Sequence, residues 1–185
     1  KHGNLKVWEI CKSSSSAPTY FPCHVMNISG SDVPLIDGGV VANNPTACAI
    51  AEGASVNKAL KDKDKALDVE KDFLVASFGT GETTRKITAA QAKEWGAAEW
   101  VLPMIDVLFD GSADSVDYIA TQLLDKRNYF RFQVDLGKGN DDMDNASQEN
   151  LNELKQIANN YINSTIAQKK LNDLVKRLKE TEKAG

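Results

Sequence analysis

Asp37 is the residue with the clearest chemical context in this sequence. Residues 34–36 predict a short buried strand that ends at this carboxylate. Asn43-Asn44 before Pro45 predicts a helix start, because Asn caps helices and Pro suits the first helical position. The carboxyl ends of strands carry the ligand sites of α/β folds. A carboxylate there can accept a proton from a nucleophile about 2.6–3.2 Å away.

The dipeptide Asp37-Gly38 is also a common β-hairpin turn. A hairpin needs a returning strand, and only residues 40–42 intervene before the Asn-Asn-Pro sequence. The local pattern therefore favours a strand, a sharp glycine turn and a helix. We expect Gly38 and Gly39 to let the backbone turn without a Cβ atom that would block the site.

The sequence contains only incomplete matches to the known nucleophile and phosphate-binding motifs. The sequence G-A-S-V-N at 53–57 lacks the final glycine of a nucleophile elbow and lies in a predicted helix, so Ser55 is interpreted as an exposed helical serine. Gly79-Thr80-Gly81 lacks the third glycine and the lysine of a phosphate loop. His24 could complete a triad with Asp37, but a lone histidine beside a strand is more often structural.

No metal or cofactor site is predicted. The acidic residues near the predicted start of a late helix could bind Ca²⁺ through their carboxylates, but their spacing is not that of an EF-hand. Negative charge just before a helix is favourable without a metal, by about 0.3–1 kcal/mol per group. These residues are Asp135, Asp141, Asp142 and Asp144.

Composition indicates one ordinary soluble domain. Of the 185 residues, 42% are hydrophobic and 26% are charged, and the formal net charge of −4 argues against nucleic-acid binding. No apolar run reaches the roughly 20 residues of a membrane span. Cys11, Cys23 and Cys48 show no C-x-x-C spacing, so we expect reduced thiols and a cytoplasmic location. Three glycosylation acceptor patterns, at Asn27, Asn145 and Asn163, leave a secreted location as the alternative.

The first half of the chain predicts alternating helices and strands. We expect a helix over 5–13, a hairpin formed by 24–28 and 33–36 around a turn at 30–32, and a helix over 45–58. The charge-dense residues 58–72 predict a solvated surface. Residues 73–78 form a continuous apolar run, typical of a strand covered on both faces. This order predicts a mostly parallel sheet with helices packed outside.

The second half predicts five helical segments and one strand. We expect helices over 89–99 and 104–109, an interruption at Gly111-Ser112, and a resumed helix over 115–126. Residues 129–136 alternate and predict a half-exposed strand near a sheet edge. Ser147 caps a helix with an apolar stripe, and residues 171–178 carry another amphipathic helix. The basic residues of that last helix could touch an anionic membrane, although a solvated face is favoured; they are Lys169, Lys170, Lys176, Arg177 and Lys179.

Four stretches along the chain carry a family resemblance. They are S-S-A-P-T-Y-F-P at 15–22, D-G-G at 37–39, N-N-P-T at 43–46 and S-F-G-T-G at 77–81. In this order and spacing they resemble the second half of a patatin-like phospholipase catalytic domain. The resemblance implies an α/β fold with a mostly parallel sheet flanked by helices, here as an incomplete domain. It would include residues 1–136, and 137–185 would form a C-terminal helical region packed on it.

The resemblance also implies a reaction. Members of this family cleave lipid acyl esters with a serine in G-x-S-x-G and an Asp-Gly-Gly aspartate as its base, which would be Asp37. Tyr20 and Phe21 would line the acyl pocket, with plain core packing as the alternative. Neither the serine elbow nor a glycine-rich oxyanion loop is present in these residues, and the chain begins with Lys1, so we expect both in a preceding part of a longer product.

Two hypotheses for function follow. The first is a lipid acyl hydrolase, acting on phospholipids or galactolipids during transient contact with a membrane surface, for which this chain supplies the aspartate. The second is a non-catalytic module that binds its missing N-terminal half or a lipid surface. Neither the head group nor the oligomeric state is readable from the residues.

Overall fold

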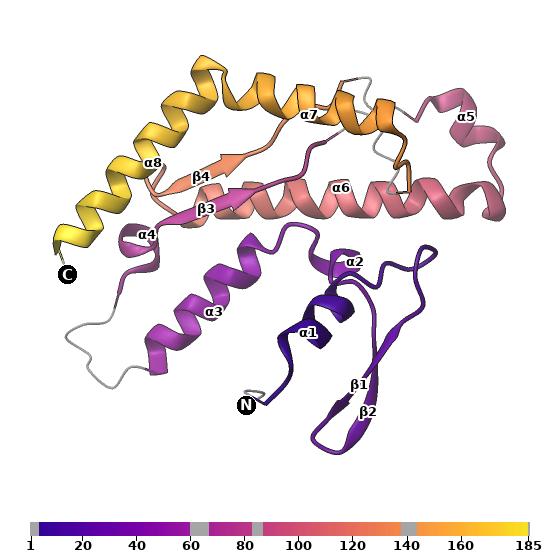
Figure 1. Cartoon of the computed structure of the whole chain (residues 1–185), viewed down its shortest axis with the longest axis horizontal. Coiled ribbons are helices and arrows are strands. Elements are labelled where there is room, and N and C mark those ends of the chain that lie inside the picture. Colours follow the sequence, from indigo (N-terminus) through magenta and orange to yellow (C-terminus); the bar gives the residue numbers. More distant parts are fainter. Residues whose placement is uncertain (1–3, 60–66, 83–86, 138–143, 185) are drawn as a thin grey trace. The chain divides into compact units, whose positions relative to one another are not determined.

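The computed structural model describes residues 4–59, 67–82, 87–137 and 144–184. The chain forms two compact units, one from Lys1–Asn44 with Glu94–Asp114 and one from Pro45–Lys93 with Ser115–Gly185. Both units combine helices with a two-stranded sheet (Figure 1). The predicted α/β class is therefore confirmed.

The first unit is built around an antiparallel hairpin. Helix α1 (Val7–Ser14) contacts β1 (His24–Ile28), which pairs with β2 (Ser31–Leu35) from His24 opposite Leu35 to Ile28 opposite Ser31. The two connecting residues both have positive φ, 55° at Ser29 and 88° at Gly30. This is the backbone of the two-residue turns that match strand twist. The hairpin is confirmed, but its turn lies at 29–30, ahead of the predicted 30–32.

The prediction of a buried strand before Asp37 is wrong in this unit. β2 ends at Leu35, its side chains are at most half-buried, and Ile36 is 49% exposed. Among the described residues β2 pairs with β1 alone. Asp37 then leads through Gly38 into a single helical turn, α2 (Gly39–Ala42).

The second unit contains a parallel strand pair. β3 (Val75–Phe78) and β4 (Tyr129–Phe132) run parallel with Val75 opposite Tyr129 and Phe78 opposite Phe132. A bridge between Glu82 and Asp135 continues the pairing. This pair confirms the expectation of parallel pairing, and β4 alternates half-buried and buried residues as predicted.

Helices cover both faces of this parallel pair. On one side Ile50 of α3 (Thr46–Ala59) packs with Ala120 and Leu124, and Phe73, Val75 and Tyr129 border that cluster. On the other side Phe130 and Phe132 pack with Leu174 of α8 (Thr165–Ala184), bordered by Tyr161 of α7 (Gln148–Ile162). Successive side chains of a strand point to opposite faces, so β4 contributes Tyr129 to one cluster and Phe130 and Phe132 to the other.

Two predictions about the strands and helices need correction. Phe78, the last residue of the apolar run 73–78, is 67% exposed and stacks on Phe132 at 4.9 Å between ring centroids, so this strand is not covered throughout. α6 (Ala97–Leu123) continues through Gly111 without interruption, and the break instead falls at Trp95-Gly96, after α5 (Ala89–Glu94). A helical glycine costs only about 1 kcal/mol, which the packing of the same helix offsets.

The first of the two C-terminal helices begins as predicted, whereas the last helix begins at Thr165, ahead of the predicted residues 171–178. The hydroxyl of Ser147 accepts a hydrogen bond from the Asn150 amide at the start of α7. α8 follows after Asn163 and Ser164. No helix in the described part of the chain combines the length and apolarity needed to cross a bilayer.

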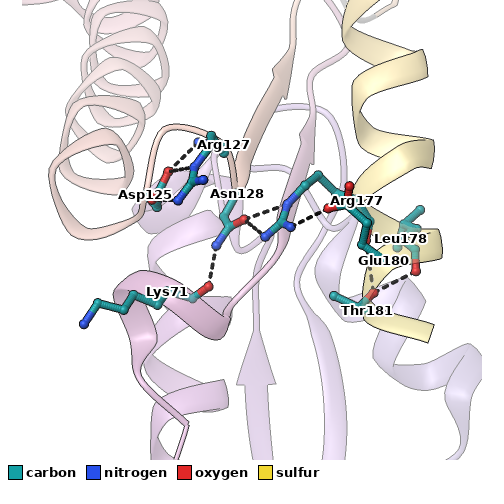
Figure 2. A network of polar contacts seen from close by, with 8 residues as sticks. All are labelled: Lys71, Asp125, Arg127, Asn128, Arg177, Leu178, Glu180 and Thr181. Carbon is teal, nitrogen blue, oxygen red and sulfur yellow. Dashed lines mark hydrogen bonds and ion pairs between the residues drawn. The ribbon is translucent and has the colours of Figure 1, made fainter. Parts of the chain in front are cut away.

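Polar contacts hold α8 and the short helix α4 (Val69–Asp72) to Asn128, the residue before β4 (Figure 2). Arg177 donates to Oδ1 of Asn128 from Nε at 3.1 Å and from Nη2 at 2.6 Å, and also pairs with Glu180. Asn128 Nδ2 donates to the carbonyl of Lys71, which belongs to α4, at 2.6 Å. Asn128 is only 3% exposed, so its amide is a buried link between three segments.

Other basic side chains of α8 also have partners within the unit. Lys170 donates to the carbonyl of Arg131 at 2.6 Å and lies over the ring of Phe132, and Lys169 pairs with Asp173 at 2.8 Å. With Arg177, three of the five cations considered for membrane contact are engaged internally. These contacts favour the interpretation of α8 as a helix docked on its own unit.

Candidate active site

Asp37 is held in a defined conformation by two short backbone contacts. Its amide donates to the carbonyl of Ser16 at 3.0 Å, and its carboxylate oxygen Oδ1 accepts the Gly39 amide at 2.7 Å. Val40 donates to the Asp37 carbonyl as the chain enters α2. Within the described ranges, Oδ2 accepts no hydrogen bond, so one carboxylate oxygen is oriented and the other is available. Asp37 itself is half-buried.

The two glycines after Asp37 serve different purposes from the one expected. Gly38 has ordinary helical angles, φ −64° and ψ −20°, and a Cβ there would meet nothing within 4 Å. A Cβ on Gly39 would lie 3.0 Å from Oδ1 of Asp37. The expectation that both glycines free the turn is wrong for Gly38. At Gly39 the missing side chain allows the close approach of the carboxylate to the amide.

The serine run before the site forms the C-terminal end of α1 and the residues that follow it. Three hydroxyls donate to carbonyls four residues earlier in α1: Ser13 to Glu9 at 2.8 Å, Ser15 to Cys11 at 2.9 Å and Ser16 to Lys12 at 2.7 Å. Ser13 and Ser16 are buried, at 7% and 4% exposure. The bonds from Ser15 and Ser16 add partners to the carbonyls of Cys11 and Lys12, which lie in the last turn of the helix, where carbonyls lack partners further along the helix.

The predicted pocket residues follow Ser16 directly. The amides of Tyr20 and Phe21 both donate to the carbonyl of Ala17, and Thr19, which precedes them, adopts φ 74°, an unusual conformation for a β-branched residue. Tyr20 is 42% exposed and Phe21 is 63% exposed. Neither ring is buried in a core of this chain, and their place in an acyl pocket stays a prediction.

His24, the alternative partner considered for Asp37, makes no hydrogen bond to its carboxylate within the described residues. His24 lies in β1 with its ring 6.1 Å from that of Trp8, and its Nε2 has no hydrogen-bond partner among the described residues. The Asp37 carboxylate bonds to Gly39 instead. Ser55 lies on an exposed part of α3, as predicted.

The Gly79-Thr80-Gly81 turn has a structural role in the second unit. The Gly79 amide donates to the Phe132 carbonyl at 2.8 Å and the Gly81 amide donates to Oε1 of Gln133 at 3.3 Å. Gly81 has φ 121°, and a Cβ there would lie 2.6 Å from Leu136. Both amides are already occupied, so the structure does not support phosphate binding at this turn.

Sequence reasoning missed a buried polar cluster in the second unit. Thr46 donates its hydroxyl to Ser77 Oγ at 2.8 Å, and Arg131 Nη1 donates to the same oxygen at 3.0 Å. Thr46 and Ser77 are 5% and 7% exposed. Thr46 ends one of the stretches that carry the family resemblance and Ser77 begins another. That both residues lie in such stretches was the one sequence feature that could have indicated the contact. The cluster joins the start of α3 to β3 and β4.

Tyr129 extends the polar contacts of this unit and predicts a dependence of stability on pH. Burial, together with a hydrogen bond of 2.6 Å to Asp117, raises the pKa of Tyr129 to about 12.

A group whose pKa is raised in the folded state contributes its full stabilisation below the unfolded pKa, which is about 10 for Tyr. This contribution of Tyr129 is lost as pH rises to about 12. Urea unfolding of the complete protein should show that decline, smaller in Tyr129→Phe. The control Tyr118→Phe, at a 67% exposed position, should keep the full decline of unfolding free energy with pH. An equal decline in both variants would contradict the assignment to Tyr129.

No group of three or more metal-ligating side chains occurs in the parts of the chain that the structure describes. Two of the four residues considered for Ca²⁺, Asp141 and Asp142, lie outside the described residues. Asp135 accepts the Gly137 amide at 2.7 Å.

Known proteins resemble this chain over most of its length. It is 36% identical over 177 residues to Patatin-like protein 3 of Arabidopsis thaliana, which covers 83% of this chain and 40% of that protein. It is 33% identical over 187 residues to Patatin-like protein 2 of Oryza sativa subsp. indica, covering 89% and 46%. It is 32% identical over 184 residues to Probable inactive patatin-3-Kuras 1 of Solanum tuberosum, covering 89% and 48%. No family model matches the chain.

The α/β units, the motif-bearing stretches and these similarities agree on one class of protein. The chain belongs to the patatin-like family, and it matches the C-terminal part of these longer proteins. It spans less than half the length of the curated relatives described above.

Proposed function

We propose that the complete protein is a lipid acyl hydrolase in which Asp37 is the general base for a serine outside this chain. The observation that carries the proposal is the geometry of the Asp37 carboxylate: Gly39 holds Oδ1 at 2.7 Å while Oδ2 accepts no hydrogen bond among the described residues. Membership of the patatin-like family supports the same assignment.

The proposed mechanism needs one proton acceptor from this chain. As the serine oxygen attacks the ester carbonyl, its proton passes to Oδ2 of Asp37. The tetrahedral intermediate expels the alcohol portion of the lipid, which takes the proton and leaves an acyl-serine. Water then attacks the acyl group and gives a proton to Asp37; the bond between the acyl carbon and the serine oxygen breaks, the serine oxygen takes that proton back from Asp37, and the fatty acid is released. The bond from Gly39 orients the carboxylate through both steps.

The proposed substrate is a fatty acyl ester of a phospholipid or galactolipid. Phe21 and Tyr20 expose apolar surface in the loop that begins at Ser16, and Ser16 contacts Asp37 directly. Such rings suit contact with an acyl chain. The protein would meet its substrate at a membrane surface in the cytoplasm, and the three exposed free thiols suit that reducing compartment.

The function is tested by incubating the complete protein with phosphatidylcholine vesicles and, separately, with galactolipid micelles, and measuring released fatty acid. Release from either lipid is the expected result. Stable binding to the lipid without release from any acyl ester would overturn the proposal.

A non-catalytic binding module is the second candidate function. A relative 32% identical to this chain is named a probable inactive patatin, so the family name does not guarantee catalysis. The 185 residues also contain no G-x-S-x-G sequence. This candidate predicts lipid binding, or association with the remaining part of the domain, with no release of fatty acid in the same assay.

A further inference from the structure

We propose that Ser16 is a positioning residue for Asp37, an inference that rests on the proposed role of Asp37 as general base. Ser16 connects the C-terminal end of α1 to the Asp37 loop, defined as residues 37–42. It does so with two different groups, its hydroxyl and its backbone carbonyl.

The first connection fixes Ser16 to the helix. Its hydroxyl donates to the Lys12 carbonyl at 2.7 Å, and its amide donates to the Ser13 carbonyl at 3.3 Å. Ser16 is 4% exposed and is followed by Ala17 at 6%. Because water has little access to this peptide, the hydroxyl has no equivalent partner if the bond to Lys12 breaks.

The second connection fixes Asp37. The Ser16 carbonyl accepts the Asp37 amide at 3.0 Å. Among the described residues, this is the hydrogen bond that joins the Asp37 loop to a distant segment, because the other bonds of residues 37–42 are local. A shift of the Ser16 peptide would therefore move the backbone from which the carboxylate projects.

A displacement of this kind affects catalysis more than substrate binding. A general base must lie within hydrogen-bond reach of the proton that it removes. A misplacement of 1 Å in a catalytic group costs roughly 10²-fold in rate, so partial loosening should cost about tenfold.

The neighbouring serines provide matched controls. Ser13 is buried and Ser15 is exposed, and each donates its hydroxyl to a carbonyl four residues earlier, as Ser16 does. Neither residue bonds to the Asp37 loop. A role in terminating α1 is shared by all three serines, whereas positioning Asp37 is specific to Ser16.

The experiment compares Ser16→Ala, Ser13→Ala and Ser15→Ala in the complete protein. We expect Ser16→Ala to lower kcat about tenfold with KM within about twofold, and both controls to keep kcat within about twofold. Amide hydrogen exchange should accelerate in residues 37–42 only in Ser16→Ala. In an Asp37→Asn background, Ser16→Ala should cause no further loss of kcat, because the two residues act as a unit.

Each outcome decides the inference. Equal losses of kcat in Ser16→Ala and Ser13→Ala would indicate general destabilisation and overturn it. Unchanged kcat and exchange in Ser16→Ala, with Asp37→Asn inactive, would also overturn it while leaving the proposed function intact. Full activity of Asp37→Asn would instead reject Asp37 as the base. If Ser16→Ala does not fold, Ser16→Cys keeps a weaker donor and should give an intermediate loss of kcat; parent kcat in that variant would overturn the inference.

Discussion

Asp37→Asn in the complete protein should lower kcat for lipid ester hydrolysis by about 10³-fold, within the range that a positioned general base contributes. The amide has nearly the same volume as the carboxylate, and its oxygen can still accept the Gly39 amide that Oδ1 accepts at 2.7 Å. The loop should therefore keep its conformation, and KM should stay within about twofold. Steady-state release of fatty acid from lipid vesicles measures both constants.

The matched control for this variant is Asp32→Asn. Asp32 lies on the exposed part of β2 in the same unit and accepts a hydrogen bond from Asn27 Nδ2 at 2.9 Å. It undergoes the same chemical change and the same change in charge, and kcat should stay within about twofold of the parent. Parent-level kcat in Asp37→Asn, or equal losses in both variants, would contradict the role of Asp37 as a base.

Asn128→Ala should lower the free energy of unfolding by about 3 kcal/mol, since it removes three side-chain hydrogen bonds at a residue that is 3% exposed. The Lys71 carbonyl would lose the hydrogen bond that the Asn128 side chain donates to it. Arg177 would lose two bonds from its guanidinium, although it would keep its contact with Glu180 (Figure 2). Urea unfolding should show a lower midpoint with an unchanged slope.

Asn172→Ala is the matched control for Asn128→Ala, because Asn172 is an exposed residue of α8. Alanine favours helix more than asparagine, so this variant should be as stable as the parent or slightly more stable. Adding Arg177→Ala to Asn128→Ala should cost less than the sum of the single losses, because both variants remove the same two bonds. Strict additivity, or a loss below about 1 kcal/mol in Asn128→Ala, would show that the contacts contribute little.

The elements that local interactions define were predictable from the sequence. The hairpin of β1 and β2, the Ser147 cap of α7 and the amphipathic α8 lie where periodicity and capping place them. Alternation in residues 129–136 also predicted a half-exposed strand, of which residues 129–132 form β4. Each of these signals depends on residues within a few positions of each other, so a linear sequence contains it in full.

The burial of the strand side chains and the continuity of helix α6 were not predictable in the same way. Leu35 and Ile36 have the composition of a buried strand, and Phe78 ends an apolar run, yet Ile36 and Phe78 are 49% and 67% exposed. Composition states that a side chain prefers burial, whereas the neighbouring elements decide whether anything covers it. Gly111 similarly suggested a helix end, but its small local cost is outweighed by the packing of Ala120 and Leu124 further along the same segment.

Asp37 is recognisable as the candidate base from the sequence alone, because its type, its two following glycines and three other stretches occur in a characteristic order. The contacts that position it are not recognisable in the same way. Ser16 and Asp37, like Thr46 and Ser77 or Asn128 and Arg177, are pairs of residues that lie 21 or more positions apart. Hydrogen bonds over such separations form only when folding has brought both segments together, so the tertiary structure alone decides which serine in the run holds the aspartate.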